Sequence, residues 1–279
     1  MRKNLYVIAD FDHTITSKDS KSSWGVLETS TLQSKRSQKK SQEYLNYYIK
    51  KEKDPSIPFD EKKELMKEWA NKNMDLFIEN KLKKKDIDKI SKSKNCMNLR
   101  NGVEDFFEFT YQNNIPLIII SAGITDIIEN FLKANKLLYD NVHIISNKIK
   151  YSNNIIAGFT EKTIHVLGKD KAIVPHNVKE IIKDKNQVLL LGDNIEDTYM
   201  IPKKLINSSI KIGFINGNTE NYKEYKKYFD YIFDDESTFT QIIEIIKGLM
   251  WNIKHISNQS FLIYMFKPHE YLIHRQAFY

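Results

Sequence analysis

Two acidic residues, one residue apart, follow the first apolar segment of the chain. Asp10 and Asp12 come directly after residues 5–9, Leu-Tyr-Val-Ile-Ala. In an extended strand, residues i and i+2 project to the same side, so both carboxylates can approach one ligand. Two close carboxylates repel each other unless a cation or a shared proton lies between them. The pair therefore predicts a bound metal, most simply Mg²⁺, although an Asp-rich turn that caps a helix has the same composition.

Two later positions offer groups that bind phosphate. Ser121 ends the apolar run 116–120 and precedes a helical pattern, so its hydroxyl and the free backbone N–H groups form a ready site for an anion. A serine there can also simply cap the helix. Lys169 lies shortly before another helical pattern and could neutralise phosphate charge as a point cation. Most lysines of so lysine-rich a chain, however, lie in solvent.

A second acidic pair ends a third apolar run. Asp193 and Asp197 follow residues 188–191 and lie four residues apart across a turn into a helix. Acidic residues in the first turn of a helix also complement its dipole, which is the alternative interpretation of this pair. In open α/β sheets, however, ligands bind outside the carboxyl ends of the strands. We therefore predict that both acidic pairs, the serine and the lysine meet at one crevice.

The elements that would position these groups alternate along the chain. Short, branched apolar runs bounded by Gly, Asp, Asn or Ser are typical of buried parallel strands. Such runs occur at residues 4–9, 116–120, 188–191 and 210–215. Helical spacing of apolar residues occurs at 103–112, 124–132, 178–183 and 239–247. The alternation predicts an α/β fold with a Rossmann-like, doubly wound parallel sheet as its core.

Residues 18–99 break this alternation. They are rich in Lys, Ser, Glu and Asn, show helical periodicity and contain no convincing strand. We therefore predict an all-helical cap, 18–99, inserted after the first strand into a core formed by residues 1–17 and 100–250.

Two further segments stand outside the strand and helix pattern. Residues 148–158 suggest a hairpin that turns at Asn153-Asn154. The tail, 251–279, contains aromatic residues without clear periodicity, and its pattern assigns it no role.

Composition narrows the class of protein. The chain has 279 residues, 41% of them hydrophobic, and 43 basic against 36 acidic side chains. We interpret the net charge of +7 as background composition, so we expect neither a polynucleotide nor a membrane partner. No run approaches the roughly 18 apolar residues of a membrane span. The single Cys96 excludes an intramolecular disulfide, which favours a cytoplasmic location. The sequence does not specify the oligomeric state.

The motifs together resemble a known superfamily. D-F-D-H-T at 10–14, S-A-G at 121–123, Lys169 and G-D-N-I-E-D at 192–197 match, in order and spacing, the four motifs of the haloacid dehalogenase superfamily of phosphohydrolases. More narrowly, residues 4–249 resemble the cytosolic pyrimidine 5′-nucleotidases of type III. Asp54-Pro55 and Glu68-Trp69 in the predicted cap also match that family's pattern, whereas Asn73 stands where the family has a serine.

The resemblance implies a role for each motif residue. Asp10 would be the nucleophile and Asp12 the general acid/base. Substrate would contact Ser121, Ala122 and Lys169. The metal, Mg²⁺, would be held by Asp10, the backbone carbonyl of Asp12 and Asp193, with Asp197 and Thr14 in supporting positions. Glu52 matches the glutamate that hydrogen-bonds the nucleobase; without the resemblance it would be a solvated helix residue.

The implied function is Mg²⁺-dependent hydrolysis of nucleoside 5′-monophosphates, pyrimidine nucleotides favoured, through an aspartyl-phosphate intermediate. Two alternatives stay open. The protein could be a phosphatase for another small phosphometabolite, because the superfamily motifs fix only the phosphoryl chemistry. It could also be a non-catalytic nucleotide-binding domain, although binding alone requires neither a nucleophile nor its acid.

Overall fold

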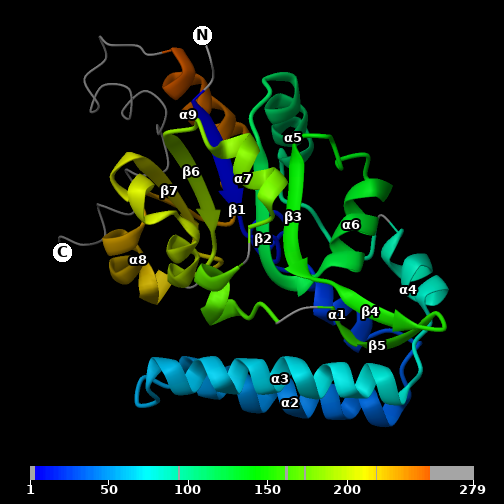
Figure 1. Cartoon of the computed structure of the whole chain (residues 1–279). Helices are drawn as coiled ribbons and strands as arrows, with labels where there is room; N and C mark the ends of the chain where they lie inside the picture. The colour runs from blue at the N-terminus through cyan, green and yellow to red at the C-terminus, as the bar shows by residue number, and fades with distance from the viewer. Residues whose placement is uncertain (1–3, 94, 161–162, 173, 218, 252–279) are drawn as a thin grey trace.

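The computed structural model describes residues 4–93, 95–160, 163–172, 174–217 and 219–251. Its main sheet has the strand order β3-β2-β1-β6-β7-β8, and every pairing in it is parallel (Figure 1). The strands are β1 (Leu5–Ala9), β2 (Leu117–Ile124), β3 (Val142–Asn147), β6 (Gln187–Gly192), β7 (Ser209–Phe214) and β8 (Tyr231–Phe233).

Helices cover both faces of this sheet because its strands are apolar on both sides. Leu5, Val7 and Ala9 of β1 pack with one layer of helices, α5 (Val103–Gln112), α6 (Thr125–Ala134) and α9 (Phe239–Trp251). Tyr6 and Ile8 pack in a second core with α7 (His176–Ile182) and α8 (Tyr222–Tyr228). This three-layer arrangement confirms the predicted α/β fold with a Rossmann-like sheet.

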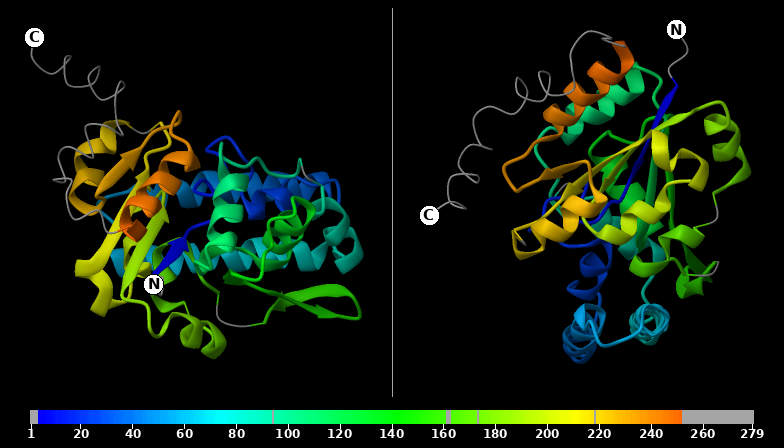
Figure 2. Two further views of the ribbon diagram at one scale, coloured as in Figure 1. Left: turned by 90° about the horizontal axis from the view of Figure 1, so that it is seen from above. Right: turned by 90° about the vertical axis from the view of Figure 1, so that its left-hand side faces the viewer.

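The residues between β1 and α5 form helices α1 (Ser23–Glu28), α2 (Lys35–Lys53), α3 (Phe59–Glu79) and α4 (Lys84–Ser91). The chain leaves the sheet and returns at one place, where the backbone N–H of Ser17 donates to the carbonyl of Asn98 (2.8 Å). Helices α2 and α3 lie side by side below the carboxyl ends of β3 and β6 (Figure 1), and the right-hand view of Figure 2 shows the pair end-on.

The predicted hairpin is present as β4 (Ile149–Ser152) and β5 (Ile155–Phe159). Asn153 and Asn154, with φ of 49° and 63°, form its two-residue turn. Asparagine tolerates these left-handed conformations, which a tight hairpin turn requires. The hairpin also contacts the segment between α3 and α4, because the N–H of Ile156 donates to the carbonyl of Leu82 (2.9 Å).

The four predicted strands and the four predicted core helices are all present, within a few residues of the expected limits. Strands β3 and β8 were not predicted, because β3 mixes His143 and Ser146 into its apolar residues and β8 spans three residues. Short 3₁₀ helices complete the fold: η1 (Val166–Lys171), η2 (Ile195–Met200), η3 (Lys203–Ser208) and η4 (Thr219–Asn221). Residues 252–279 of the tail lie outside the described residues.

Candidate active site

The loop after β1 is tightly wound, which fixes the position of Asp10. The carbonyl of Phe11 accepts hydrogen bonds from the N–H groups of Thr14, Ile15 and Thr16 (3.4, 3.0 and 3.0 Å). His13 has a φ of 61°, a left-handed conformation that lets the chain turn back at this point. The N–H of Asp10 still donates to the carbonyl of Leu191 in β6 (3.0 Å), so its side chain leaves the sheet at the end of the central strand.

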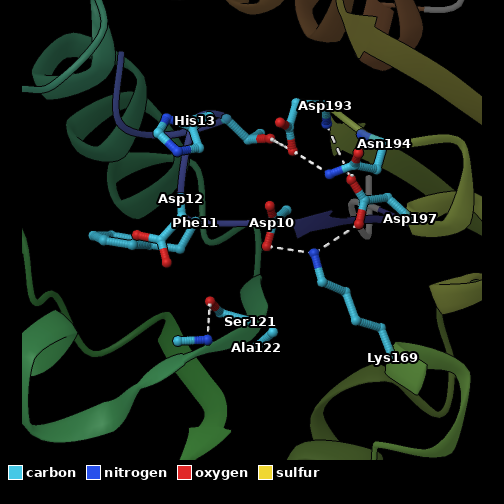
Figure 3. A network of polar contacts seen from close by, with 12 residues as sticks. Asp10, Phe11, Asp12, His13, Ser121, Ala122, Lys169, Asp193, Asn194 and Asp197 are labelled. Atoms are coloured by element: carbon cyan, nitrogen blue, oxygen red, sulfur yellow. Dashed lines mark hydrogen bonds and ion pairs between the residues drawn. The ribbon is translucent and has the colours of Figure 1, made fainter. Parts of the chain in front are cut away.

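A buried lysine joins two of the predicted acidic residues. Nζ of Lys169 lies 2.6 Å from Oδ1 of Asp10 and donates to Oδ1 of Asp197 (2.7 Å), as Figure 3 shows. The three side chains are all more than nine-tenths buried. Burial alone would lower the pKa of Lys169, but the carboxylates of Asp10 and Asp197 outweigh it and raise this pKa above its ordinary value. Lys169 therefore stays charged.

Asp193 lies on the other side of Asp10 and is held by polar neighbours. Its Oδ1 accepts from Thr14 Oγ1 (3.4 Å) and Asn194 Nδ2 (3.1 Å), and its Oδ2 accepts from Asn216 Nδ2 (3.2 Å). The N–H groups of Asp193 and Asn194 both donate to Oδ2 of Asp197 (3.0 Å each), which fixes the turn into η2. This turn aims the two acidic side chains at one point (Figure 3).

Carboxylate oxygens of Asp10, Asp193 and Asp197 lie within 4.8 Å of one another. Burial, with the nearby charges of Asp10 and Asp197, raises the pKa of Asp193 well above its ordinary value. Lys169 forms ion pairs with Asp10 and Asp197 of this cluster. The three clustered carboxylates therefore share the one positive charge of this lysine. Hard oxygen ligands and excess negative charge are what Mg²⁺ requires. Since Asp197 is already bonded to Lys169 and to two N–H groups, Asp10 and Asp193 fit the metal best.

Asp12 points elsewhere. Its carboxylate accepts from the backbone N–H and the hydroxyl of Ser23 in α1 (2.9 Å each). Burial raises the pKa of Asp12 above its ordinary value, and the two bonds from Ser23 oppose this rise. The side chain of Asp12 is therefore not among the clustered carboxylates, which agrees with a metal contact through its carbonyl only.

Ser121 does not cap a helix. Strand β2 continues through Ile124, and helix α6 has no side-chain cap, so Ser121 is not a helix cap. Its Oγ accepts from the N–H of Gly123 (2.9 Å), and the residue is buried beside Ala122 at the edge of the site (Figure 3). The carbonyl of Ala122 accepts from Trp24 Nε1 (3.0 Å) and Asn147 Nδ2 (2.7 Å), which holds the S-A-G segment in place.

A cavity of about 330 Å³ opens above these residues and reaches the helices of the insert. Its inner wall includes Asp10, Asp12, Ser121, Ala122, Lys169 and Asp193. Its outer wall includes Trp24, Glu28, Glu52, Trp69 and Asn73. Of the predicted site residues, only Thr14 and Asp197 do not line it; both contact residues that do. The cavity thus joins the acidic crevice to the helical segment in one space.

The outer wall carries polar groups without partners. Burial raises the pKa of Glu28 to about 7, and burial with the nearby charge of Glu196 raises the pKa of Glu52. Trp69 Nε1 and Asn73 Oδ1 are buried and, among the described residues, accept or donate no hydrogen bond. Trp69 also stacks on Tyr48, with ring centroids 5.9 Å apart. Unpaired buried polar atoms are costly, so this wall is suited to a polar ligand.

Sequence reasoning missed three groups around the site: Ser23, Glu28 and the pair Arg100–Asn216. Arg100 donates through Nε to the carbonyl of Thr14 (2.9 Å) and through Nη2 to that of His13 (2.6 Å), and it also contacts Asn216. The guanidinium lies over the Phe214 ring, 4.3 Å from its centroid. A single arginine between α4 and α5 gives no signal in the sequence, because its partners come from distant segments.

The sheet order, the aspartate pair after β1, the acidic turn after the neighbouring β6 and the buried lysine of η1 together define a phosphatase of the haloacid dehalogenase fold. Solved structures agree on this fold. Cytosolic 5′-nucleotidase IIIB bound to cytidine superposes with a TM-score of 0.76 and 24% identity over 88% of each chain. A substrate-bound phosphoserine phosphatase gives a TM-score of 0.55 and 13% identity over 88% of this chain and 99% of that one.

The particular family follows from the sequence match. A family model described as Pyrimidine 5′-nucleotidase (UMPH-1) matches residues 8–250, and the chain belongs to that family. The predicted resemblance is thereby confirmed. Similar proteins include the 7-methylguanosine phosphate-specific 5′-nucleotidase of Homo sapiens, 32% identical over 89% of this chain and 84% of that protein. Another is the putative cytosolic 5′-nucleotidase 3 of Caenorhabditis elegans, 28% identical over 87% of this chain and 69% of that protein.

Proposed function

We propose that the protein hydrolyses nucleoside 5′-monophosphates, pyrimidine nucleotides favoured, in a Mg²⁺-dependent reaction through an aspartyl-phosphate intermediate. One observation carries the proposal. A single cavity has the Asp10–Lys169 pair at its inner end and Glu52, with unpaired polar atoms, at its outer end. Phosphate and base lie at opposite ends of a nucleotide, so the cavity matches both ends of one substrate.

The reaction begins at Asp10. A free Oδ of this residue attacks phosphorus, the bond from phosphorus to the 5′ oxygen breaks, and Asp12 gives its proton to that oxygen. Asp12 then takes a proton from the water that cleaves the acyl phosphate. Asp10, Asp193 and the carbonyl of Asp12 would hold Mg²⁺, which would supply positive charge to screen the nucleophile from the dianionic phosphate.

The remaining core residues bind and orient. Lys169 offsets the charge on the phosphate oxygens, while Ser121 and Ala122 donate to them from the end of β2. Asp197 holds the ammonium of Lys169 in place (2.7 Å). Thr14 holds Asp193 through its hydroxyl (3.4 Å).

The insert selects the leaving group. We assign residues 18–99 to a helical cap and residues 1–17 and 100–250 to the core, with α2 and α3 over the carboxyl ends of the strands. Glu52 on α2 accepts from the base, and the cap helices that wall the cavity keep bulk water from the acyl phosphate. None of the described helices is long and apolar enough to cross a membrane. We assign the protein to the cytoplasm, as its relative named cytosolic suggests.

A second candidate substrate is N7-methylguanosine 5′-monophosphate. Several relatives are named 7-methylguanosine phosphate-specific 5′-nucleotidases. Methylation at N7 gives this base a positive charge. Two carboxyl groups, of Glu28 and Glu52, line the same cavity as the indole rings of Trp24 and Trp69. Acidic and aromatic groups attract a cationic ring, so the wall favours this base as a competitor of cytosine and uracil.

A substrate panel tests the function. We expect Mg²⁺-dependent release of phosphate from CMP, UMP or N7-methylguanosine 5′-monophosphate, with kcat/KM at least about tenfold above that for GMP or phosphoserine. EDTA should abolish turnover and excess Mg²⁺ should restore it. Phosphoserine as the best substrate would defeat the proposal, and turnover undiminished by EDTA would defeat its metal dependence.

Replacement of Glu52 separates base binding from chemistry. We expect Glu52→Ala to raise KM for the preferred nucleotide about tenfold or more, because an acceptor for the base on the cavity wall is lost, and to leave hydrolysis of 4-nitrophenyl phosphate nearly unchanged. Glu43→Ala, at an exposed position of the same helix, is the matched control. Equal losses on both substrates would contradict a role in base recognition.

A further inference from the structure

One hydroxyl connects the insert to the acid of the core. Ser23 is the first residue of α1 and is fully buried. Its backbone N–H donates to Oδ1 of Asp12 and its hydroxyl to Oδ2, each at 2.9 Å. Both oxygens of Asp12 are thus held by one residue. Two bonds from a single donor residue fix the plane of a carboxyl group as well as its position.

A third contact fixes the direction of the Ser23 hydroxyl. The N–H of Ile124, at the end of β2, donates to Ser23 Oγ (3.1 Å). A hydroxyl has one hydrogen, and the oxygen already accepts from Ile124, so the hydrogen is directed at Asp12. Gly123 leaves the room for this contact, because a Cβ there would lie 2.2 Å from Ser23 Oγ and 3.1 Å from Oδ2 of Asp12.

We propose that Ser23 is a positioning residue that aims the carboxyl group of Asp12 at the leaving oxygen of the substrate. The inference rests on the proposed function. As the bond from phosphorus to the leaving oxygen breaks and the bond to Asp10 forms, the proton of Asp12 passes to the leaving oxygen. The carboxylate that results is held by the two Ser23 bonds until water attacks phosphorus, the bond to Asp10 breaks, and one proton of that water returns to Asp12.

The same contacts connect proton transfer to the insert. Ser23 belongs to α1, so the carboxyl group of Asp12 is aimed only while the first turn of α1 sits against β2. Trp24, the next residue, bonds the carbonyl of Ala122 (3.0 Å) and packs on Phe77 of α3, with ring centroids 6.0 Å apart. The orientation of the Asp12 carboxyl group therefore depends on residues of the insert as well as on the core.

Ser22 supplies a matched control. It is the N-cap of α1, and its hydroxyl accepts from the N–H of Gly25 (3.0 Å). Ser22→Ala removes one hydroxyl from the same helix turn without removing a contact to Asp12. Loss of a cap weakens the helix, so this variant measures the purely structural effect of removing a hydroxyl here.

The test compares two leaving groups. A nucleoside leaves as an alkoxide that needs a proton, whereas 4-nitrophenolate leaves without one. We expect Ser23→Ala to lower kcat/KM for the preferred nucleotide about 10- to 100-fold and that for 4-nitrophenyl phosphate less than about threefold. Ser23→Cys, which keeps the shape with a weaker donor, should give an intermediate ratio, and Ser22→Ala should leave the ratio of the two substrates unchanged.

Equal effects of Ser23→Ala on both substrates, or a nucleotide rate equal to that of the wild type, would overturn the inference. If Ser23→Ala does not fold, Ser23→Cys is tested instead. Equal losses of kcat/KM on the nucleotide and on 4-nitrophenyl phosphate in that variant would likewise overturn the inference. Wild-type protein that turns over no nucleotide would instead defeat the proposed function itself. Normal wild-type turnover combined with equal losses would defeat the role of Ser23 alone.

Discussion

Asp10→Asn is expected to lower kcat for nucleotide hydrolysis by about 10⁴-fold or more. An amide oxygen is a poor nucleophile, and an acyl phosphate cannot form on it. The substitution also removes one of the two negative charges beside the Lys169 ammonium, whose Nζ lies 2.6 Å from Oδ1 of Asp10. Because the asparagine side chain has nearly the same shape, the neighbouring backbone turn should persist, so the loss reports chemistry rather than unfolding.

The measurement is steady-state phosphate release combined with acid-quenched labelling. Wild-type protein mixed with ³²P-labelled nucleotide should carry label that survives acid and is released by hydroxylamine, and the Asp10→Asn variant should carry none. Asp105→Asn, at an exposed position of α5, should behave as the wild type does. Turnover or labelling that survives the loss of Asp10 would assign the nucleophile to another residue.

The residues at the inner end of the cavity could be predicted because the sequence pattern indicates where buried strands end. Apolar runs that stop at Asp10, Ser121 and Asp193 mark the carboxyl edge of a parallel sheet, and parallel strands bring those residues together whatever the loop lengths between them. Lys169 follows no strand and was placed only by its position in the order of motifs. The structure gives it two buried carboxylate partners, which composition could not indicate.

The outer half could not be predicted in the same way. Which face of a helix turns to a cavity depends on packing between segments far apart in sequence, as in the contact of Ser23 with Ile124 across 101 residues. Glu52 was singled out only by resemblance, and Glu28 not at all, because a lone glutamate on a helix has the same sequence signature as a solvated one. Arg100 was missed for a similar reason, since its partners are carbonyls, which every residue has.

Lys169→Met is expected to damage activity and stability together. The lost ammonium leaves phosphate charge without its counterion, which should lower kcat/KM by about 10³-fold. It also leaves Asp10 and Asp197 as buried, unpaired carboxylates beside Asp193, so the free energy of unfolding should fall by about 3 to 5 kcal/mol. Urea unfolding in EDTA measures the second effect free of metal binding. Lys179→Met, at an exposed position of α7, should change neither quantity.

A double variant separates the two effects. Asp197→Asn, added to Lys169→Met, removes one unpaired charge while its amide oxygen can still accept from the N–H groups of Asp193 and Asn194, now 3.0 Å from Oδ2. We expect it to recover about half of the lost unfolding free energy and none of the lost activity, because charge repulsion causes the first loss and the missing phosphate contact causes the second. Activity that returned with stability would mean that Lys169 serves the fold and does not bind the substrate.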